Sequence, residues 1–318
     1  MKKIPVIAVV GPTASGKTAL SINIAKQFSG QVVSADSMQI YEKMNIATAK
    51  PTVDEMQGIP HHLISFQPID KKFSVAEYVD LAKECIEKIH SVGDIPVIAG
   101  GTGLYVDSLL QNIQFSQEDE NTEIRKELTE MFEEKGAEFM LETLREIDPE
   151  TAEKLHLKDK SRIIRALEIY KATGKTMTEQ KALSKTEPSP YNTLYIGINY
   201  RDRNVLYGRI NRRVDIMMEN GLLEEAKDFY NIPTDKTACQ AIGYKELASY
   251  FNGEKTLDEC LESLKIETRH YAKRQLTWFR KNEDINWVYP DQTQSCASTG
   301  RSHPAACSRH QFRNFRFA

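Results

Sequence analysis

The chain has 318 residues, which is enough for two domains or for one domain with an insertion. Its net charge of −3 excludes a general attraction to nucleic acid, so any such binding would need a local basic patch. No apolar run approaches a membrane span, and the first strand starts too early to leave room for a signal or transit peptide. The five cysteines are scattered without a Cys-x-x-Cys pair, which favours reduced cytoplasmic thiols over a zinc site or disulfides.

The first strong motif is Gly11–Thr18, whose sequence GPTASGKT fits the phosphate-binding pattern G-x-x-x-x-G-K-T. The apolar run Ile4–Val10 before it predicts a buried strand, and apolar residues at helical spacing follow it. Such a loop turns several N–H groups toward an anion at a helix N-terminus. Lys17 adds a point charge for the outer phosphate, and Thr18 a hydroxyl for Mg²⁺. The residues expected to hold the phosphates are Gly11, Thr13, Ala14, Ser15, Gly16, Lys17 and Thr18. By itself the motif predicts a bound diphosphate or triphosphate of unspecified identity.

Asp36 stands at the carboxyl end of the second predicted strand, Gln31–Asp36. Ligands of open parallel sheets gather at that edge, which places Asp36 beside the phosphate loop. Position alone fits two roles equally well: a catalytic carboxylate, or a group that caps a helix or positions Mg²⁺. The adjacent pair His61 and His62 lacks a third ligand at helical spacing, so we expect it to pack or hydrogen-bond in the sheet.

A second glycine turn follows a later strand. Ser74 and Glu77 form a predicted capping box for an amphipathic helix that runs to His90. The strand Ile95–Ala99 then leads into Gly100–Gly103, where Thr102 would present a hydroxyl to the site.

From about residue 116 to 186 the pattern changes to helices without convincing strands. Arg162 and Arg165 are three residues apart on one predicted helix and share a face, which is either a binding face or a solvated surface pair. The strand Leu194–Ile198 resumes the core. We therefore predict an α/β fold, a P-loop NTPase-like parallel sheet flanked by helices, with an inserted all-helical lobe. The expected division is 1–115 for the first part of the core, 116–186 for the lobe, 187–291 for the completion of the core and 292–318 for a tail.

Two later stretches are basic, Arg201–Arg213 and Lys265–Lys281. The second carries aromatic residues, a composition that suits both a phosphate backbone with stacked bases and an amphipathic helix whose aromatics are core. Taken alone, this stretch favours the core explanation. The tail contains no acidic residue after Asp291 and has no periodicity, which predicts disorder or a frameshift remnant.

Together these stretches resemble the tRNA dimethylallyltransferase (tRNA isopentenyltransferase) family, in its bacterial form without a zinc-finger extension. The resemblance runs in family order from residue 6 to about residue 288. The matching stretches are GPTASGKT at 11–18, SADSMQIY at 34–41, ATAKPT at 47–52, HHL at 61–63, GGTGLY at 100–105, SRIIRALE at 161–168, QAIGYKE at 240–246 and RHYAKRQLTWFRK at 269–281.

The resemblance implies transfer of a dimethylallyl group from its diphosphate to the N6 amine of adenosine 37, beside the tRNA anticodon. It implies that the phosphate loop holds an isoprenoid diphosphate with Mg²⁺ rather than ATP. Asp36 would be the base at the amine, and Thr102 and Lys17 would act at the reaction centre. The expected tRNA-binding residues are Asp36, Ser37, Met38, Gln39, Thr102, Ser161, Arg162, Arg165, Gln240, Gly243, Tyr244, Lys273 and Arg274. Some members carry Gln at the position of Ser161. Neither a membrane nor an obligate protein partner is implied, and the enzyme would be cytoplasmic.

Two other functions fit the phosphate loop. A P-loop kinase of a nucleoside or small metabolite would use the same loop and an Asp after the second strand, but it leaves the arginine pair and the basic aromatic stretch without a role. An RNA-binding NTP switch would bind RNA in a nucleotide-dependent way and modify no adenosine.

Overall fold

The computed structural model describes residues 3–115, 122–230, 238 and 241–293 of the chain. It divides into two compact units, which we call unit 1 (Met1–Leu110 with Pro190–Ala318) and unit 2 (Gln111–Ser189). The second unit interrupts the first in sequence, over a range close to the expected insertion at 116–186. None of the described helices is both long and apolar enough to cross a membrane.

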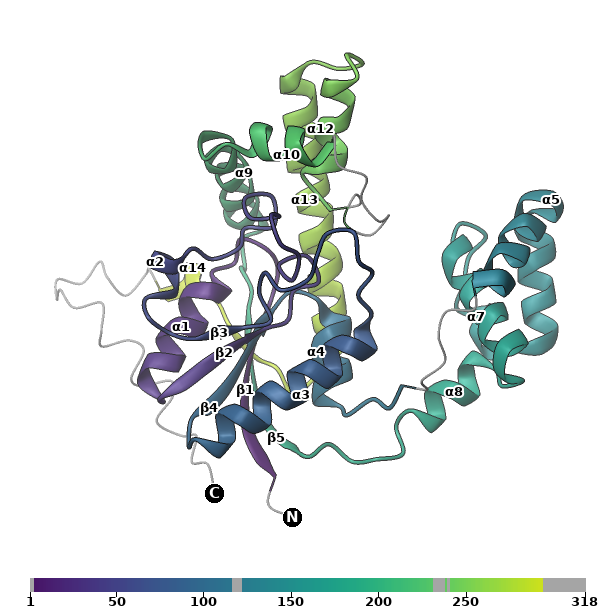
Figure 1. Ribbon diagram of the computed structural model, residues 1–318, viewed down its shortest axis with the longest axis horizontal. Coiled ribbons are helices and arrows are strands. Elements are labelled where there is room, and N and C mark those ends of the chain that lie inside the picture. The colour runs from purple at the N-terminus through teal and green to yellow at the C-terminus, as the bar shows by residue number, and fades with distance from the viewer. Residues whose placement is uncertain (1–2, 116–121, 231–237, 239–240, 294–318) are drawn as a thin grey trace. The chain divides into compact units, whose positions relative to one another are not determined.

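Within the described residues, unit 1 contains a six-stranded sheet in the order β3-β2-β4-β1-β5-β6 (Figure 1). Every pair of neighbouring strands is parallel, which confirms the expected P-loop type of α/β fold. The strands are β1 (Ile4–Val10), β2 (Gly30–Ser34), β3 (His61–His62), β4 (Ile95–Gly100), β5 (Tyr191–Ile198) and β6 (Asn286–Val288).

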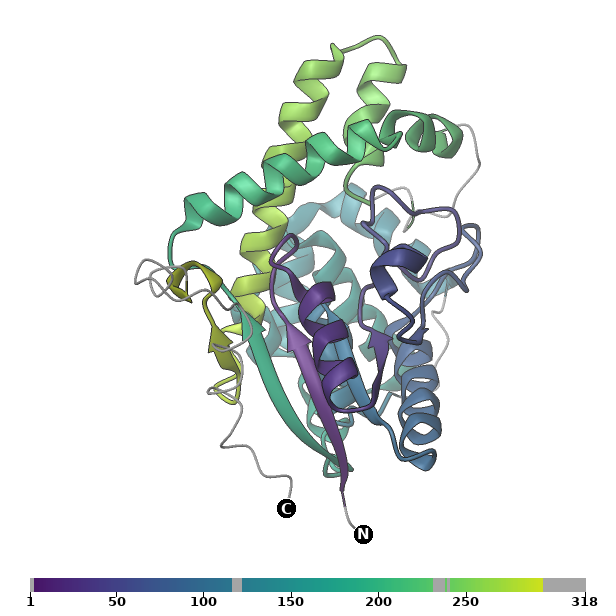
Figure 2. The ribbon, with the colours of Figure 1, turned by 90° about the vertical axis from the view of Figure 1, so that its left-hand side faces the viewer.

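Alternate residues of the central strands enter two separate cores, because successive side chains of a strand point to opposite faces. Val6, Ala8 and Val10 pack with helices α3 (Val75–Ser91) and α4 (Gly103–Leu110) on one face of the sheet. Ile7 and Val9 pack with α1 (Lys17–Gln27) on the other. Figure 2 shows α1 lying along β1. Burial on both faces explains why these strands read as continuous apolar runs.

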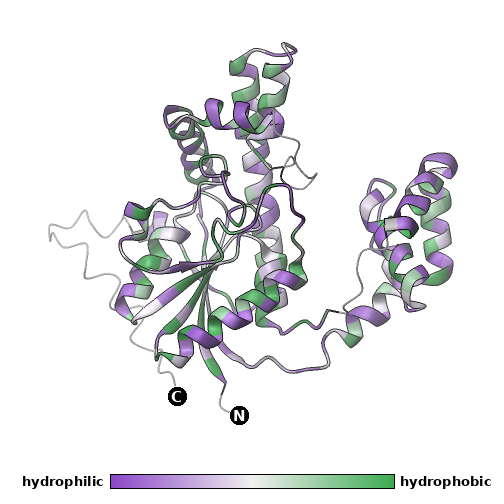
Figure 3. Cartoon of the chain, viewed as in Figure 1, coloured by the Kyte–Doolittle hydropathy of each residue, from purple (hydrophilic) through white to green (hydrophobic). Residues whose placement is uncertain are grey.

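Helix α3 begins where its capping residues predict. The Ser74 hydroxyl accepts from Glu77 N at 3.2 Å, and the Glu77 carboxylate accepts from Ser74 N at 2.7 Å. Polar and apolar residues alternate along α3 in Figure 3, and Tyr78, Ala82 and Ile86 supply its fully buried face. The predicted capping box is therefore confirmed.

The C-terminal half of unit 1 is mainly helical. A further core, distinct from the two of the sheet, joins these helices to the loop that follows β2, through Tyr41, Met44, Leu222 and Leu264. The helices that contribute to it are α9 (Arg203–Glu219), α10 (Leu222–Tyr230), α12 (Tyr244–Phe251) and α13 (Leu257–Phe279). Unit 1 also contains two short helices, α2 (Val53–Met56) and α14 (Pro290–Thr293). Helix α14 extends through Thr293, two residues into the range expected for the tail, 292–318. The rest of that tail, residues 294–318, lies outside the described residues.

In the described part of unit 2, every regular element is a helix, as expected. Its helices are α5 (Thr122–Ile147), α6 (Pro149–Glu153), α7 (Lys160–Thr173) and α8 (Met177–Leu183). Gly136 forms a kink inside α5, where it adopts φ 83°. Asp159 directly precedes α7, but its side chain does not cap the helix and instead accepts from His156 N at 2.9 Å.

Candidate functional site

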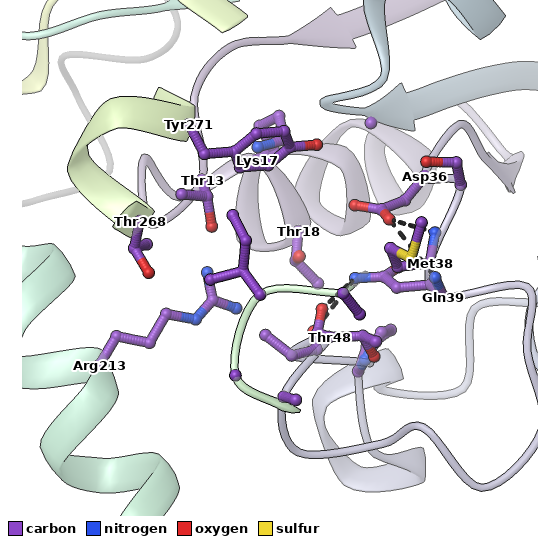
Figure 4. Close-up of a pocket in the computed structure, with 18 of the residues that line it drawn as sticks. Thr13, Lys17, Thr18, Asp36, Met38, Gln39, Thr48, Arg213, Thr268 and Tyr271 are labelled. Carbon is purple, nitrogen blue, oxygen red and sulfur yellow. Dashed lines mark hydrogen bonds between the residues drawn. The ribbon is translucent and has the colours of Figure 1, made fainter. Parts of the chain in front are cut away.

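A cavity of about 310 Å³ opens in unit 1 at the carboxyl ends of β1, β2 and β4 (Figure 4). The phosphate loop and the turn after β2 form two of its walls, and helices α9 and α13 with the segment before α12 form the others. Its lining includes Thr13, Lys17, Thr18, Asp36, Ser37, Met38, Gln39, Ala47, Thr48, Ala49, His61, Ile210, Arg213, Val214, Met217, Leu222, Ala241, Gly243, Leu264, Thr268, Tyr271, Arg274 and Gln275.

The phosphate loop owes its shape to residues with positive φ. Gly11, Ala14 and Gly16 have φ of 143°, 60° and 101°. A side chain at Gly11 would bring a Cβ within 2.6 Å of Ile198 O, so only glycine fits against β5 there. These conformations let the loop curl between β1 and α1, as the G-x-x-x-x-G-K-T pattern predicts.

Side chains from the C-terminal half fasten the outside of this loop. Arg209 Nε donates to Ala14 O at 2.9 Å, and the Tyr200 hydroxyl donates to Ser15 O at 3.1 Å. These two hydrogen bonds fix the backbone of the loop at Ala14 and Ser15. Ser15 Oγ is buried and has no hydrogen-bond partner among the described residues.

Lys17 lies at the start of α1 and lines the cavity. Its Nζ donates to Pro12 O at 2.7 Å. Burial lowers the pKa of Lys17 to about 8, the nearby Asp36 charge opposes that shift and Arg213 adds to it. An anion bound in the loop would raise this pKa again, since it would stabilise the ammonium form.

Gln275 of α13 connects the phosphate loop to the second glycine turn. Its Oε1 accepts from Thr13 N at 2.8 Å, while its Nε2 donates to Gly101 O at 3.0 Å. A Cβ at Gly101 would come within 2.1 Å of that Nε2, and one at Gly103 within 2.2 Å of the Trp278 ring. The glycines of this turn are therefore required for the close approach of α13.

Asp36 and Thr102 each order the turn after β2. Asp36 Oδ1 accepts from Met38 N at 2.9 Å and, more weakly, from Gln39 N at 3.4 Å. Within the described residues no donor bonds Oδ2. Thr102 Oγ1 accepts from Ser37 N at 3.0 Å. Asp36 lines the cavity, whereas Thr102 reaches it indirectly, through Ser37 and through the hydroxyl of Tyr271.

Tyr271 presents its hydroxyl to the same corner. Burial raises its pKa well above the ordinary value, and the Asp36 charge raises it further, against hydrogen bonds with Thr102 and Gln275. The hydroxyl therefore stays protonated and can donate a hydrogen bond. The family resemblance covers Tyr271 without assigning it a role.

Gln39 is held by the loop that follows. Its Nε2 donates to Thr48 O and Ala49 O, each at 3.2 Å (Figure 4). The amide oxygen accepts from the Ser34 hydroxyl at 3.4 Å. Gln39 is thereby fixed in the cavity wall on the side of Asp36.

Arg213 was not predicted as a site residue. It extends from α9 toward Thr18, across the cavity from Asp36 (Figure 4). Burial lowers its pKa, and the charges of Asp36 and Glu55 oppose the shift; a guanidinium nevertheless stays charged in proteins. The sequence signal was the basic stretch Arg201–Arg213, which does not tell which arginine faces inward.

The remaining predicted residues of unit 1 differ in their placement. Arg274 lines the cavity, but Lys273 is an exposed residue of α13 outside it. Gly243 lines the cavity, whereas Tyr244 is buried, with its ring stacked on Phe229 at 4.4 Å between centroids. Gln240 lies outside the described residues.

Ser161, Arg162 and Arg165 belong to α7 of unit 2. Ser161 is exposed, and Arg162 has 73% of its side chain exposed beside Asp159. Arg165 Nη1 donates to the buried Glu168 at 2.9 Å, and Arg125 lies 3.7 Å from the same carboxylate. Glu168 thus gathers two arginines on the surface of this unit.

The comparisons with known proteins agree with one another. Residues 39–282 match the family model described as IPP transferase. The chain is 47% identical over 291 residues to a tRNA dimethylallyltransferase of Caldanaerobacter subterraneus subsp. tengcongensis, covering 91% of this chain and 92% of the relative. It is 49% identical over 283 residues to one of Bacillus cytotoxicus, covering 89% of each.

Solved structures give the same result. The tRNA isopentenylpyrophosphate transferase of Bacillus halodurans superposes with a TM-score of 0.67 at 42% identity, over 93% of this chain and 94% of that one. A eukaryotic dimethylallyltransferase, captured in crystallographic snapshots while acting on tRNA, gives a TM-score of 0.77 at 31% identity, over 92% of this chain and 75% of that one.

Proposed function

The chain belongs to the IPP transferase family, and from that premise we propose that it transfers a dimethylallyl group to tRNA. The donor is dimethylallyl diphosphate, the acceptor is the exocyclic N6 amine of adenosine 37, and diphosphate is released. The observation that carries the proposal is one continuous cavity whose wall includes both the phosphate loop and Asp36. We place the enzyme in the cytoplasm, with tRNA, and expect it to need no obligate protein partner.

The diphosphate occupies the end of the cavity formed by Thr13, Lys17 and Thr18. Lys17 and Arg213 then flank the leaving group, together with backbone N–H groups of the loop other than those of Thr13 and Ser15, which donate to Gln275 and Pro12. When the bond between C1 and the bridging oxygen breaks, its electron pair leaves on the diphosphate, and these preorganised donors stabilise the growing charge. The apolar wall contributed by Val214, Met217 and Leu222 suits the dimethylallyl group.

Asp36 serves as the general base. The N6 amine of adenine is a weak nucleophile, so a carboxylate that accepts its proton while the N6–C1 bond forms lowers the barrier. The free Oδ2 of Asp36 suits this role, because Oδ1 is already occupied by Met38 N. We propose that Ser37, Met38 and Gln39 surround the base and that Thr102 supports the turn that carries them.

The residues present also fit Mg²⁺. The Thr18 hydroxyl and the Asp36 carboxylate line the cavity, and hard oxygen donors are the ligands that Mg²⁺ prefers. No cluster of three or more metal-ligating side chains occurs in the described part of the chain. This suits an ion that takes most of its ligands from substrate phosphates and water. We propose that Thr18 binds the ion directly; once bound, it would offset negative charge on the diphosphate.

We propose that tRNA contacts the basic surface of α13, at Lys273 and Arg274, and the α7 residues Ser161, Arg162 and Arg165 of unit 2. Gln240 and Gly243 belong to the same proposed set. Tyr244 is buried, so we assign it a supporting role rather than a contact with RNA.

The test is mass spectrometry of tRNA nucleosides after incubation of the full chain with unmodified tRNA, dimethylallyl diphosphate and Mg²⁺. We expect N6-dimethylallyl adenosine at position 37. A parallel reaction with ATP, and calorimetry of both ligands, completes the experiment. Transfer of the terminal phosphate of ATP to a small acceptor, with unmodified tRNA, would instead identify a kinase. Nucleotide-dependent RNA binding without modification would identify an RNA-binding switch.

A further inference from the structure

A carboxylate outside the cavity holds together two of its walls. Glu225 lies on α10, where it is half-buried, and it does not line the cavity. It accepts hydrogen bonds from three consecutive backbone amides of the loop after β2. Asn45 N lies 2.9 Å from Oε2, Ile46 N lies 2.9 Å from Oε2 and 3.0 Å from Oε1, and Ala47 N lies 3.0 Å from Oε1.

The same carboxylate engages the segment before α12. The Tyr244 hydroxyl donates to Glu225 Oε1 at 2.8 Å, and the Tyr244 ring stacks on Phe229. Gly243, next to it, packs so closely on the loop that a Cβ there would lie 3.0 Å from the Ala47 Cβ. Ala47 and Gly243 both line the cavity, so Glu225 joins two walls of the site from behind.

The loop that Glu225 holds also orients Gln39. Asn45–Ala47 is followed at once by Thr48 and Ala49, whose carbonyl oxygens accept both hydrogen bonds of the Gln39 amide. The loop closes on itself through Ala49 N to Ile46 O and Lys50 N to Asn45 O, each at 2.9 Å. A shift of residues 45–47 would therefore move the two carbonyl groups, and Gln39 with them.

We propose that Glu225 is a positioning residue that fixes the loop 45–49, and through it Gln39, in the wall that receives the acceptor base. This inference rests on the proposed function. Hydrogen bonds to a charged group are among the stronger ones in proteins, and an amide side chain could accept only some of those that Glu225 accepts. Small displacements of positioning groups away from the chemistry can cost about a hundredfold in rate.

The test compares Glu225→Gln with its matched control Glu224→Gln, which removes the charge of an exposed neighbour. For Glu225→Gln we expect kcat/KM for tRNA to fall about a hundredfold, while the affinity for dimethylallyl diphosphate stays at the wild-type value. Hydrogen exchange at Asn45, Ile46 and Ala47 should accelerate in that variant alone. Glu224→Gln should match the wild type in all three measurements.

A double-mutant cycle with Gln39→Ala separates positioning from a general loss of structure. If Glu225 acts through the loop and Gln39, the loss caused by Glu225→Gln should be much smaller in the Gln39→Ala background. Independent, additive losses would overturn the inference. So would equal tRNA kinetics of the Glu225→Gln and Glu224→Gln proteins.

Two further measurements allow the result to be interpreted in every case. If Glu225→Gln does not fold, Tyr244→Phe removes one donor from the carboxylate without removing the charge, and a smaller fall in kcat/KM for tRNA at unchanged diphosphate affinity is expected. No change in Tyr244→Phe would then count against the inference. The wild-type protein is assayed first, because absence of dimethylallyl transfer there contradicts the proposed function itself and not only the role of Glu225.

Discussion

Lys17 is a cavity residue whose charge we expect to change near pH 8, because burial lowers its pKa to about that value. In the free protein the ammonium form therefore predominates below that pH and is lost above it. Affinity for dimethylallyl diphosphate should therefore weaken as the pH rises through about 8. Binding near this pH should also take up protons, because the bound anion raises the pKa of Lys17.

Calorimetry in buffers of different ionisation enthalpy measures both effects. The control is Lys17→Arg, whose guanidinium stays charged throughout and should abolish the proton uptake. An identical pH dependence in the wild type and in Lys17→Arg would show that another group titrates.

Asp36 permits a sharper test at the same scale. Asn at this position keeps the size and an oxygen that can accept from Met38 N, so Asp36→Asn should preserve the turn and the binding of both substrates. The amide of Asn cannot act as an effective base. In the Asp36→Asn variant, single-turnover rates with both substrates saturating should therefore fall about 10²–10⁴-fold. A Mg²⁺ titration distinguishes the alternative, since a rate restored by extra Mg²⁺ alone would make Asp36 a metal-positioning residue.

The sequence singled out Lys17 by its motif and Asp36 by its place at a strand end, because both are local signals, and both residues line the cavity. Gln275 and Arg213 were missed, since they reach the site from helices far along the chain. Gln275 is a buried polar residue of α13, but its partners, Thr13 N and Gly101 O, lie more than 170 residues away in the sequence.

At the scale of elements, the long and strongly patterned segments were predicted well. Strand β1 has the expected limits, and helix α3 ends at Ser91, one residue after its expected end. Strand β3 has only two residues, which pair with Val32 and Val33 at the edge of the sheet. A strand of two residues is too short to show a periodic pattern in its sequence. The core explanation favoured for the aromatics of α13 applies to Phe279, which is buried, but not to Trp278, whose exposed indole donates to Asp107 at 2.7 Å.

The basic surface of α13 is a part of unit 1 that we expect to bind the tRNA backbone. Lys273 and Arg274 are both exposed. Replacing both by Ala should weaken tRNA binding and flatten its salt dependence, by about one unit of slope for each phosphate that the protein no longer neutralises. Neither residue belongs to the phosphate loop, so the affinity for dimethylallyl diphosphate should remain near that of the wild type. Because Arg274 also lines the cavity, Lys273→Ala alone is measured as well, and it should lower the tRNA salt slope with the diphosphate affinity unchanged.

Binding measured across a salt series gives this slope. The matched control is Lys88→Ala, because this exposed lysine lies near the end of α3, toward the amino edge of the sheet and away from the cavity. If the double variant and Lys88→Ala have equal tRNA affinities and salt slopes, Lys273 and Arg274 do not bind the tRNA backbone.

For the molecule as a whole, we propose that unit 1 carries out the transfer and that unit 2 helps to hold the tRNA. Among the residues that the structure describes, those lining the cavity all lie in unit 1, and so do those of its helical and sheet cores. Unit 2 has a core of its own, with Met140, Leu144 and Ile163 fully buried. The insertion expected at 116–186 falls inside unit 2, and its signal in the sequence is that strand–helix alternation stops there and resumes at β5.

Deleting unit 2 tests that division. Helix α4 runs back from the carboxyl edge of β4, and β5 starts at the amino edge of the sheet, so Leu110 and Pro190 both approach that edge. A flexible linker of about eight residues, which spans up to roughly 27 Å, should join them. The shortened protein should retain its fold by circular dichroism and its affinity for dimethylallyl diphosphate, but lose tRNA binding and transfer. Transfer at the wild-type rate would contradict a role of unit 2 in holding tRNA.

If the shortened chain does not fold, the double variant Arg162→Ala and Arg165→Ala in the full chain tests the same role. Its tRNA affinity should fall and the salt dependence of tRNA binding should flatten, while its affinity for dimethylallyl diphosphate stays unchanged.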